Sequence, residues 1–301
     1  MEVRLVGVEH ADEVWSVVRA AFEARAPLDP PADALGDDRS GFAAGLARHG
    51  GLLATVEGTA VGALLLDPGP DGLVLRRFGV RPEAQGAGVA SAMVQAAVDA
   101  AFGHPALVVF ARQELPRTIT FWQDHGFVEV TRRAPYVELR RTVQRSTVVP
   151  DAAAMRALGA RVGRTLRAGD LVVLTGELGA GKTTFTQGLG EGLGVRAGVT
   201  SPTFVISRVH PSLVGGPDLV HVDAYRLGGV DELDDLDLDA SLAEAVTVVE
   251  WGAGVVEQLA ETRLEVLIER AVGGPDPAAP TDDDGEPLDP RRVQFSRITP
   301  G

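Results

Sequence analysis

The chain has 301 residues, of which 45% are hydrophobic and 23% charged, a composition typical of a globular protein of about two domains at roughly 150 residues each. It contains no cysteine, which excludes disulfides, thiolate zinc sites and a cysteine nucleophile. The formal net charge is −14 and acidic residues outnumber basic ones in both halves, which disfavours direct binding of a nucleic-acid backbone by either half.

No export or membrane signal is evident in the sequence. The segment MEVRLVGVEHADEVW lacks the basic, apolar and small-residue order of a signal peptide. No apolar run reaches the roughly 18 residues of a membrane-spanning helix. We therefore expect a cytoplasmic location and no membrane partner.

The N-terminal half alternates short apolar runs with helical patterns. Apolar residues at helical spacing predict a helix over 11–26, and Glu57-Gly58-Thr59 predicts a hairpin turn between two β-rich runs. A glycine-rich loop opens a long helix that ends near residue 102, and a shorter helix over 118–125 ends at Gly126. The predicted strands cover 3–8, 51–56, 59–67, 73–80, 106–112, 127–130 and 136–140.

The glycine-rich loop is a candidate anion site, because the first N–H groups of a helix lack intrahelical partners and small residues let a pyrophosphate approach them. The order of elements, the Gln-x-x-Gly-x-Ala loop and the later FWQDHGF resemble the GNAT acyltransferase family over nearly all of residues 1–142. The resemblance implies an α+β domain with a mixed sheet that binds acetyl-CoA. It implies that backbone at Phe78, Gly79 and Val80 holds the pantetheine arm, and that the pyrophosphate lies against Gln85, Gly86, Ala87, Gly88, Val89, Ala90 and Ser91.

The catalytic side of this half departs from the family pattern. Trp122 stands where many members have the tyrosine that protonates the leaving thiolate, and an indole N–H is no acid near neutral pH. Arg76 and Arg77 lie in the strand that often supplies a carboxylate base. His125 and Tyr136 are candidates to replace the acid, although a single histidine or tyrosine is more often structural. The sequence favours acetyl-CoA binding over any particular transfer and does not identify an acceptor.

The second half begins after a weakly patterned stretch over 140–150, so we predict domains at 1–145 and 146–301. A helical pattern over 153–166 precedes a continuous apolar run over 168–175, which is typical of a buried parallel strand. These elements predict a P-loop NTPase domain with a mainly parallel sheet.

The pattern Gly176-x-x-x-x-Gly181-Lys182-Thr183 follows that strand, opens a helix and fits the P-loop motif in full. Lys182 is the only lysine in the chain, and a compact ammonium suits the β- and γ-phosphates of a nucleotide. The hydroxyl of Thr183 suits Mg²⁺. We therefore expect ATP to bind at Gly176, Glu177, Leu178, Gly179, Ala180, Gly181, Lys182, Thr183 and Thr184.

Two buried runs downstream end in acids, since 219–222 precedes Asp223 and 246–249 precedes Glu250. A P-loop needs such a carboxylate at the end of a neighbouring strand, so these are candidates for the nucleotide site. An isolated acid at a strand end is usually a cap or turn residue, but two of them after a P-loop favour a functional role.

Four segments in this order, GELGAGKTTFTQGLGEGLG, VTSPTF, HVDAYRL and VVEW, resemble the bacterial TsaE ATPase family over about residues 147–270. That family works with the TsaB and TsaD proteins in making threonylcarbamoyladenosine on tRNA. The resemblance therefore implies TsaB-like and TsaD-like partners, and contact with tRNA only through the complex.

The same resemblance implies roles for particular residues. Lys182, Asp223 and Glu250 would be catalytic, with Thr183 and Glu250 holding Mg²⁺ and Asp223 supporting the metal and its water. Trp251 would pack beside the site and Thr203 would sense the γ-phosphate. The stretch 232–245 departs from the family because it is unusually acidic and has Asp237 where glycine is common, which leaves partner contacts there open.

The C-terminal segment has two interpretations. Residues 273–290 are rich in proline and aspartate and predict a loop, while 291–298 alternates as a strand does. The loop is either an insertion before a last strand of the sheet or the start of a tail. The function also has alternatives, because a P-loop serves small-molecule kinases and nucleotide-gated scaffolds without catalysis, the latter with a degenerate GNAT domain.

Overall fold

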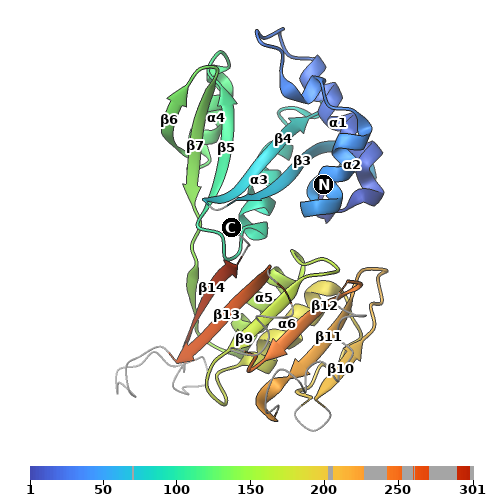
Figure 1. The fold of residues 1–301 in the computed structure, drawn as a ribbon, viewed down its shortest axis with the longest axis vertical. Coiled ribbons are helices and arrows are strands. Elements are labelled where there is room, and N and C mark those ends of the chain that lie inside the picture. Colours follow the sequence, from blue (N-terminus) through green and yellow to red (C-terminus); the bar gives the residue numbers. More distant parts are fainter. Residues whose placement is uncertain are drawn as a thin grey trace. The chain divides into compact units, whose positions relative to one another are not determined.

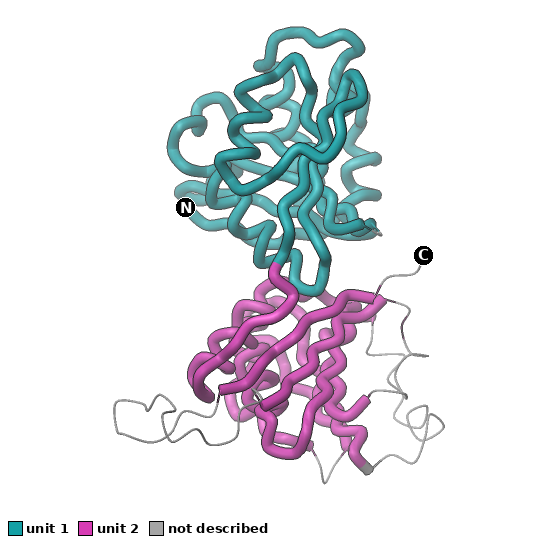
Figure 2. The backbone as a smooth tube through the Cα atoms, turned by 90° about the vertical axis from the view of Figure 1, so that its left-hand side faces the viewer, with its two compact units in different colours: residues 1–143 teal, residues 144–301 magenta. Residues whose placement is uncertain are grey.

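The computed structural model describes residues 1–69, 71–202, 206–226, 243–252, 260, 262–270 and 290–298. The chain forms two compact units, Met1–Val143 and Gln144–Gly301, each with its own sheet (Figure 2). Within the described ranges, no helix is both long and apolar enough to cross a membrane.

The first unit is a mixed seven-stranded sheet with helices on both faces (Figure 1). The strand order is β1-β2-β3-β4-β5-β7-β6, and only β4 and β5 run parallel as neighbours. The strands are β1 (Glu2–Val6), β2 (Gly51–Val56), β3 (Thr59–Gly69), β4 (Gly72–Val80), β5 (Ala106–Arg112), β6 (Val128–Arg133) and β7 (Tyr136–Thr142). The helices are α1 (Ala11–Glu23), α2 (Arg39–His49), α3 (Val89–Ala100) and α4 (Pro116–Asp124).

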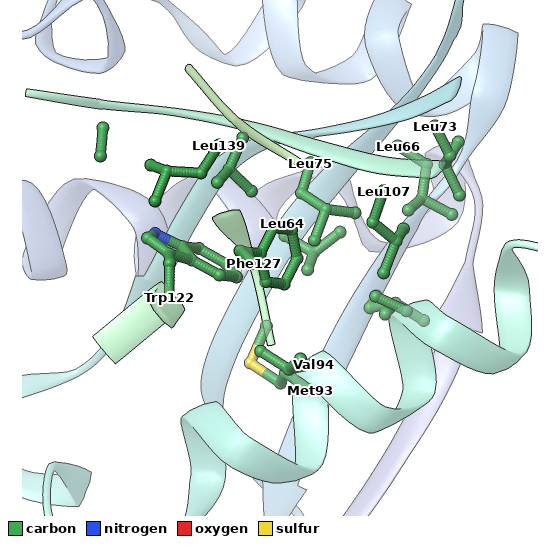
Figure 3. Packing of buried hydrophobic residues seen from close by; sticks show 14 of the residues in the cluster. Leu64, Leu66, Leu73, Leu75, Met93, Val94, Leu107, Trp122, Phe127 and Leu139 are labelled. Atoms are coloured by element: carbon green, nitrogen blue, oxygen red, sulfur yellow. The ribbon is translucent and has the colours of Figure 1, made fainter. Parts of the chain in front are cut away.

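Two apolar clusters hold the helices to the two faces of this sheet. One cluster joins α1 and α2 to the sheet through Val14, Val17, Phe42, Leu46 and Leu53. The other lies on the side of α3 and α4, where each fully buried large side chain contributes about 1.5–3 kcal/mol of transfer free energy. Figure 3 shows this second cluster, which includes Leu64, Leu66, Leu73, Leu75, Met93, Val94, Leu107, Trp122, Phe127 and Leu139.

The parallel strands β4 and β5 separate after a short contact. Their ladder consists of Leu73 with Leu107 and Val74 with Val108 only. Further along β4, the pairing with β3 shifts register, and Arg77 has a φ of 56°, which a non-glycine residue adopts at a local distortion. The two strands therefore diverge and leave a wedge at the centre of the sheet (Figure 1).

The second unit is also a seven-stranded mixed sheet, in the order β10-β11-β12-β9-β13-β14-β8. Its four central strands are parallel, and β10, β14 and β8 join antiparallel, so the predicted parallel sheet has antiparallel edges. The elements are β8 (Ser146–Val149), α5 (Ala152–Gly163), β9 (Leu171–Thr175), α6 (Lys182–Leu193), β10 (Ser207–His210), β11 (Asp218–Asp223), β12 (Ala245–Glu250), β13 (Arg263–Arg270) and β14 (Arg291–Ile298).

The strand predicted over 291–298 is confirmed, because β14 pairs along its whole length with β13. The stretch 273–289 therefore lies in the chain between two paired strands, although those residues themselves are outside the described part of the structure. The sequence pattern missed β8, which pairs with β14 and brings the first residues of this unit into its sheet.

Helices α5 and α6 pack closely because glycines line their contact. A Cβ built at Gly188 would lie 2.0 Å from the Arg156 carbonyl oxygen, and one at Gly159 would lie 2.2 Å from the Phe185 carbonyl oxygen. Both distances are shorter than any side chain tolerates, so only glycine permits this approach. The packing fixes α6, the helix whose first residue is Lys182.

Candidate functional sites

The loop between β9 and α6 curls through three glycines with positive φ. Gly176 has a φ of 156°, Gly179 of 76° and Gly181 of 107°, and Gly181 is the N-cap of α6. A Cβ at Gly176 would lie 2.4 Å from the Ile268 carbonyl oxygen on β13. The loop is therefore pressed against the sheet and presents the free N–H groups of a helix start, which is an arrangement suited to an anion.

Lys182 lies under this loop and is 5% exposed. Its Nζ donates to the carbonyl oxygens of Gly176 at 2.8 Å and Glu177 at 3.0 Å, and lies 3.7 Å from the centroid of the Trp251 ring. Burial lowers the pKa of Lys182, while the charges of Glu250 and Asp223 act in the opposite direction. The ammonium is thus held beside the loop by two carbonyl groups and an aromatic face.

The two predicted acids end neighbouring parallel strands at the same level of the sheet. Asp223 on β11 is directly paired with Glu250 on β12, and both are buried. The hydroxyl of Thr183 donates to Glu250 Oε1 at 3.1 Å. Asp223 accepts from the Ser201 hydroxyl and from the Tyr225 N–H, each at 3.1 Å. The carboxyl ends of these strands therefore bring two acids to the start of α6.

Trp251 lies beside the site as the sequence predicted, and its backbone explains how. Its N–H donates to the Leu174 carbonyl at 3.0 Å, which continues the ladder between β12 and β9. Its φ is 62°, an unusual value for a bulky residue that turns the chain directly after Glu250. The ring then meets the Lys182 ammonium on one side and the Tyr225 ring at 5.3 Å.

The sequence interpretation missed His221. Its side chain is 0% exposed, and its Nε2 lies 2.9 Å from Glu250 Oε1. A signal existed, because residues two apart on a strand share a face and His221 therefore shares the face of Asp223. Ser201 and Tyr225 were also missed. Ser201 contacts Asp223 from a loop, and the Tyr225 N–H contacts it from the 3-10 helix Ala224–Arg226, which directly follows β11.

A cavity of about 460 Å³ lies over these groups. Gly176, Glu177 and Ala180 belong to the loop but do not line the cavity, and Thr203 is outside the described residues. The lining residues are Leu178, Gly179, Gly181, Lys182, Thr183, Thr184, Ser201, Asp223, Tyr225, Glu250 and Trp251.

The oxygen groups suit a magnesium ion that arrives with phosphate. In the part of the chain that the structure describes, no group of three or more His, Cys, Asp or Glu could hold a metal by itself. Thr183, Glu250 and Asp223 instead offer one hydroxyl and two carboxylates. Mg²⁺ typically takes one or two carboxylates and completes its shell with substrate phosphates and waters, so these residues fit that ion.

The first unit has a cavity of about 480 Å³ where β4 and β5 diverge. Of the predicted residues, Phe78, Val80, Gln85 and Ala90 line it. Gly79 does not, and a Cβ there would lie 2.8 Å from the Ala21 Cβ, so this glycine serves the packing of α1 on β4. The wedge leaves backbone groups of β4 beyond Val74 unpaired with β5, as an extended amide-bearing ligand would need.

The predicted anion loop lies at the start of α3. Gly86 and Gly88 have φ values of 82° and 79°, with open space where a Cβ would be, and Gly88 is the N-cap of α3. Ala87 precedes this cap and Val89 is buried as the first residue of the helix. The Ser91 hydroxyl lies 3.0 Å from His125 Nε2, which places His125 at the first turn of α3.

The candidate acids occupy different environments. Trp122 is 5% exposed, and its ring meets those of Phe78 and Phe127, each at 5.0 Å, so it is a core residue that also lines the cavity (Figure 3). Tyr136 lines the cavity and donates to Asp33 Oδ2 at 3.1 Å. Burial raises the pKa of Tyr136, and its bond to Asp33 adds to this, so the phenol is protonated at neutral pH.

The β4 arginines have carboxylate partners. Arg76 forms an ion pair with Asp67, and Arg77 donates to Asp37 at 2.7 Å. A guanidinium stays protonated at neutral pH, so neither arginine provides a base. Asp33 is the only carboxylate among the described residues that line this cavity.

The architecture and the sites define two classes of domain in one chain. An α+β domain with a split sheet comes first, and a P-loop α/β domain follows it. The second half matches the family model described as threonylcarbamoyl adenosine biosynthesis protein TsaE over residues 149–273. The tRNA threonylcarbamoyladenosine biosynthesis protein TsaE of Streptomyces coelicolor is 72% identical over 120 residues, which cover 40% of this chain and 81% of that protein. The chain therefore belongs to the TsaE family.

The first half matches the Acetyltransferase (GNAT) family model over residues 12–127, so the chain is a fusion of a GNAT-like domain with a TsaE-type domain. Two solved structures are also similar. Bacillus subtilis YdiB is 29% identical with a TM-score of 0.38 and covers 52% of this chain and 85% of its own. PaiA N-acetyltransferase of Thermoplasma acidophilum, in complex with coenzyme A, is 12% identical with a TM-score of 0.41. The match covers 47% of this chain and 98% of that protein.

Proposed function

We propose that the second unit is a Mg²⁺-dependent ATPase that supports threonylcarbamoyladenosine modification of tRNA together with TsaB-like and TsaD-like proteins. The observation that carries the proposal is the position of Lys182, the chain's only lysine, beneath a P-loop and beside Thr183, whose hydroxyl meets Glu250 at 3.1 Å. Membership of the TsaE family supports the pathway, and the TsaB-like and TsaD-like partners are part of this proposal. Contact with tRNA would then be through the complex.

Each residue has a role that follows from its environment. The N–H groups of the loop and the start of α6 bind the phosphates, and the Lys182 ammonium leaves the loop carbonyls to meet the β- and γ-phosphates. Thr183 and Glu250 would hold Mg²⁺, which neutralises phosphate charge when bound. Asp223 supports the attacking water, whose oxygen bonds to the γ-phosphorus as the bond to the bridging oxygen breaks. Trp251 and Tyr225 cover one side of the site.

The test uses the full chain, with and without the partner proteins. Calorimetry measures ATP binding, and the release of free phosphate measures turnover. Lys182→Ala removes a charge-assisted bond of about 1.5–3 kcal/mol, so ATP affinity should fall roughly 10–100-fold. Lys182→Arg should fail too, because a planar fork does not fit a buried slot shaped for a point charge. Normal ATP binding and turnover by Lys182→Ala would refute the proposal.

The alternatives give different products in the same assay. A kinase would transfer phosphate to an added acceptor and release little free phosphate. A non-catalytic scaffold would bind ATP but show no turnover even with both partners. We favour hydrolysis because the carboxylates of the described site, Asp223 and Glu250, already contact Ser201, Tyr225 and Thr183.

We further propose that the first unit binds acetyl-CoA. The supporting observation is the cavity between the diverging strands β4 and β5, together with the open N-terminus of α3. Backbone near Phe78–Val80 would take the pantetheine arm and Gln85–Ser91 the pyrophosphate. Calorimetry with coenzyme A tests this, and an absence of binding would leave this unit as a GNAT fold retained for other contacts.

A further inference from the structure

Three side chains from three elements form a hydrogen-bonded series at the nucleotide site. Thr183 on α6 donates to Glu250 Oε1 on β12 at 3.1 Å, and His221 Nε2 on β11 lies 2.9 Å from the same oxygen. His221 is paired in register with Val248, two residues before Glu250, so the imidazole reaches diagonally along the sheet to the carboxylate. Both partners are almost completely buried, Glu250 being 3% exposed.

The environment of His221 assigns the direction of this bond. A carboxylate only accepts hydrogen bonds, so Nε2 must carry the hydrogen. Nδ1 is buried without a hydrogen-bond partner among the described residues, as expected of the ring nitrogen that bears no proton in this tautomer. His221 therefore donates through Nε2 to Glu250 Oε1.

We propose that His221 is a positioning residue, which orients the Glu250 carboxylate toward Thr183 and the cation of a bound Mg²⁺-nucleotide. This inference rests on the proposed nucleotide function of the second unit. Without the Nε2–H donor, the buried Glu250 carboxylate would have Thr183 as its one remaining described side-chain partner. Partners that orient a metal ligand from behind commonly change metal affinity about 10–100-fold when they are removed.

His210 provides a matched control on the neighbouring strand. The pairing of His210 with Leu219 puts its side chain on the same face of the sheet as His221. It is 6% exposed and its Nε2 has no partner within the described residues, so it is a buried histidine of similar environment. Among the described residues, the histidine that contacts Glu250 is His221, so replacing His210 removes a buried imidazole but leaves the Glu250 series intact.

The experiment measures the affinity of the full chain for a non-hydrolysable ATP analogue by calorimetry over a range of Mg²⁺ concentrations and in EDTA. His221→Met keeps the volume but removes the donor, and should weaken the Mg²⁺-dependent gain in affinity by about 10–100-fold. His221→Gln places an N–H near the position of Nε2 and should retain most of the gain. His210→Met should match the wild type, and affinity in EDTA should be unchanged in all variants.

Several outcomes would overturn the inference. These are a wild-type Mg²⁺ response in His221→Met, an equal loss in His210→Met, or an equal loss in EDTA. If thermal unfolding shows that His221→Met does not fold, His221→Gln and the shorter His221→Asn are compared, and equal Mg²⁺ responses in these two would refute the role.

The failure of the proposed function has a separate signature. In that case the wild-type chain would show no Mg²⁺-dependent binding of the analogue, or Lys182→Ala would bind it normally. Normal wild-type binding that is lost in Lys182→Ala, combined with an unchanged His221→Met, would refute the positioning role alone.

Discussion

The Lys182 ammonium is positioned 3.7 Å from the centroid of the Trp251 ring while it donates to the carbonyl oxygens of Gly176 and Glu177. A cation over an aromatic face contributes about 0.5–2 kcal/mol, depending on its exposure to water. An ammonium has three N–H donors and the two carbonyl oxygens accept from two of them, so phosphate oxygens compete for the same group. We therefore expect nucleotide entry to exchange at least part of these contacts for contacts with phosphate.

We expect this exchange to change the fluorescence of Trp251. Addition of ATP should shift or quench the tryptophan emission of the full chain, because the charge next to the indole moves. Trp251→Phe should abolish the signal but retain ATP binding by calorimetry, since the other two tryptophans, Trp15 and Trp122, belong to the first unit. A signal that persists in Trp251→Phe would contradict the expected movement of the ammonium away from this ring.

The glycine contact between α5 and α6 predicts a local stability effect. In Gly188→Ala, the new Cβ would lie 2.0 Å from the Arg156 carbonyl oxygen, and overpacking of this kind costs about 1–3 kcal/mol or more. Gly190→Ala on the same helix is the control, because the atoms nearest its Cβ belong to side chains that can move, Val195 and Val199 at 3.1 Å and Leu219 at 3.4 Å.

Urea unfolding of the full chain would measure this difference. Since each unit has its own core, we expect separate transitions, and Gly188→Ala should lower the midpoint of one of them much more than Gly190→Ala does. Equal midpoints for the two variants would show that α5 and α6 move apart to accommodate the Cβ at lower cost than their geometry implies.

The sequence predicts a feature of this molecule well where the type of residue and its place in a motif fit one physical role. The P-loop glycines, Lys182 and the strand-end acids were found in this way, and the structure brings Lys182, Asp223 and Glu250 to one cavity. The fold class was also predicted, because helix and strand periods are strong in the buried segments.

Other features depend on tertiary context that no local pattern encodes. Helix α2 was missed because only Phe42 and Leu46 are buried in it, although Asp38 caps it by accepting from the Gly41 N–H at 2.9 Å. The divergence of β4 from β5 depends on pairing between strands distant in sequence. The close packing of Gly79 against α1, where a Cβ would lie 2.8 Å from the Ala21 Cβ, could not be read from its neighbours in the chain.

A substitution in the loop before α3 tests the proposed binding of coenzyme A. Gly88→Glu should abolish binding, because it adds a negative charge at a helix N-terminus suited to an anion. It also forces an L side chain into a φ of 79°, which costs about 1–2 kcal/mol. Gly58→Glu is the matched control, since Gly58 has a φ of 78° and equally open space but lies in the β2–β3 turn.

Calorimetry with coenzyme A should separate the two substitutions. Gly58→Glu carries the same backbone strain and the same charge, so it should lose stability but keep its affinity. Loss of affinity in both variants would mean that strain, and not the anion site, explains the effect.

If the first unit transfers acetyl groups, Tyr136 is the residue expected to supply the acid. Trp122 and Tyr136 both line the cavity, but an indole N–H is no acid near neutral pH, whereas a phenol can donate a proton. His125 instead contacts Ser91 at the start of α3. Burial raises the pKa of Tyr136, so the phenol stays protonated up to and beyond a pH equal to its ordinary pKa of about 10.

Tyr136→Phe should therefore lower the turnover of a generic amine by about 10²–10⁴-fold while coenzyme A affinity is unchanged. His125→Gln is the control and should affect turnover much less. In the wild type, loss of the Tyr136 proton should not lower the acetylation rate at any pH below about 10, because the raised pKa moves this loss to higher pH. Acetylation that survives both substitutions would show that solvent, or the acidity of the leaving thiol itself, makes a protein acid unnecessary.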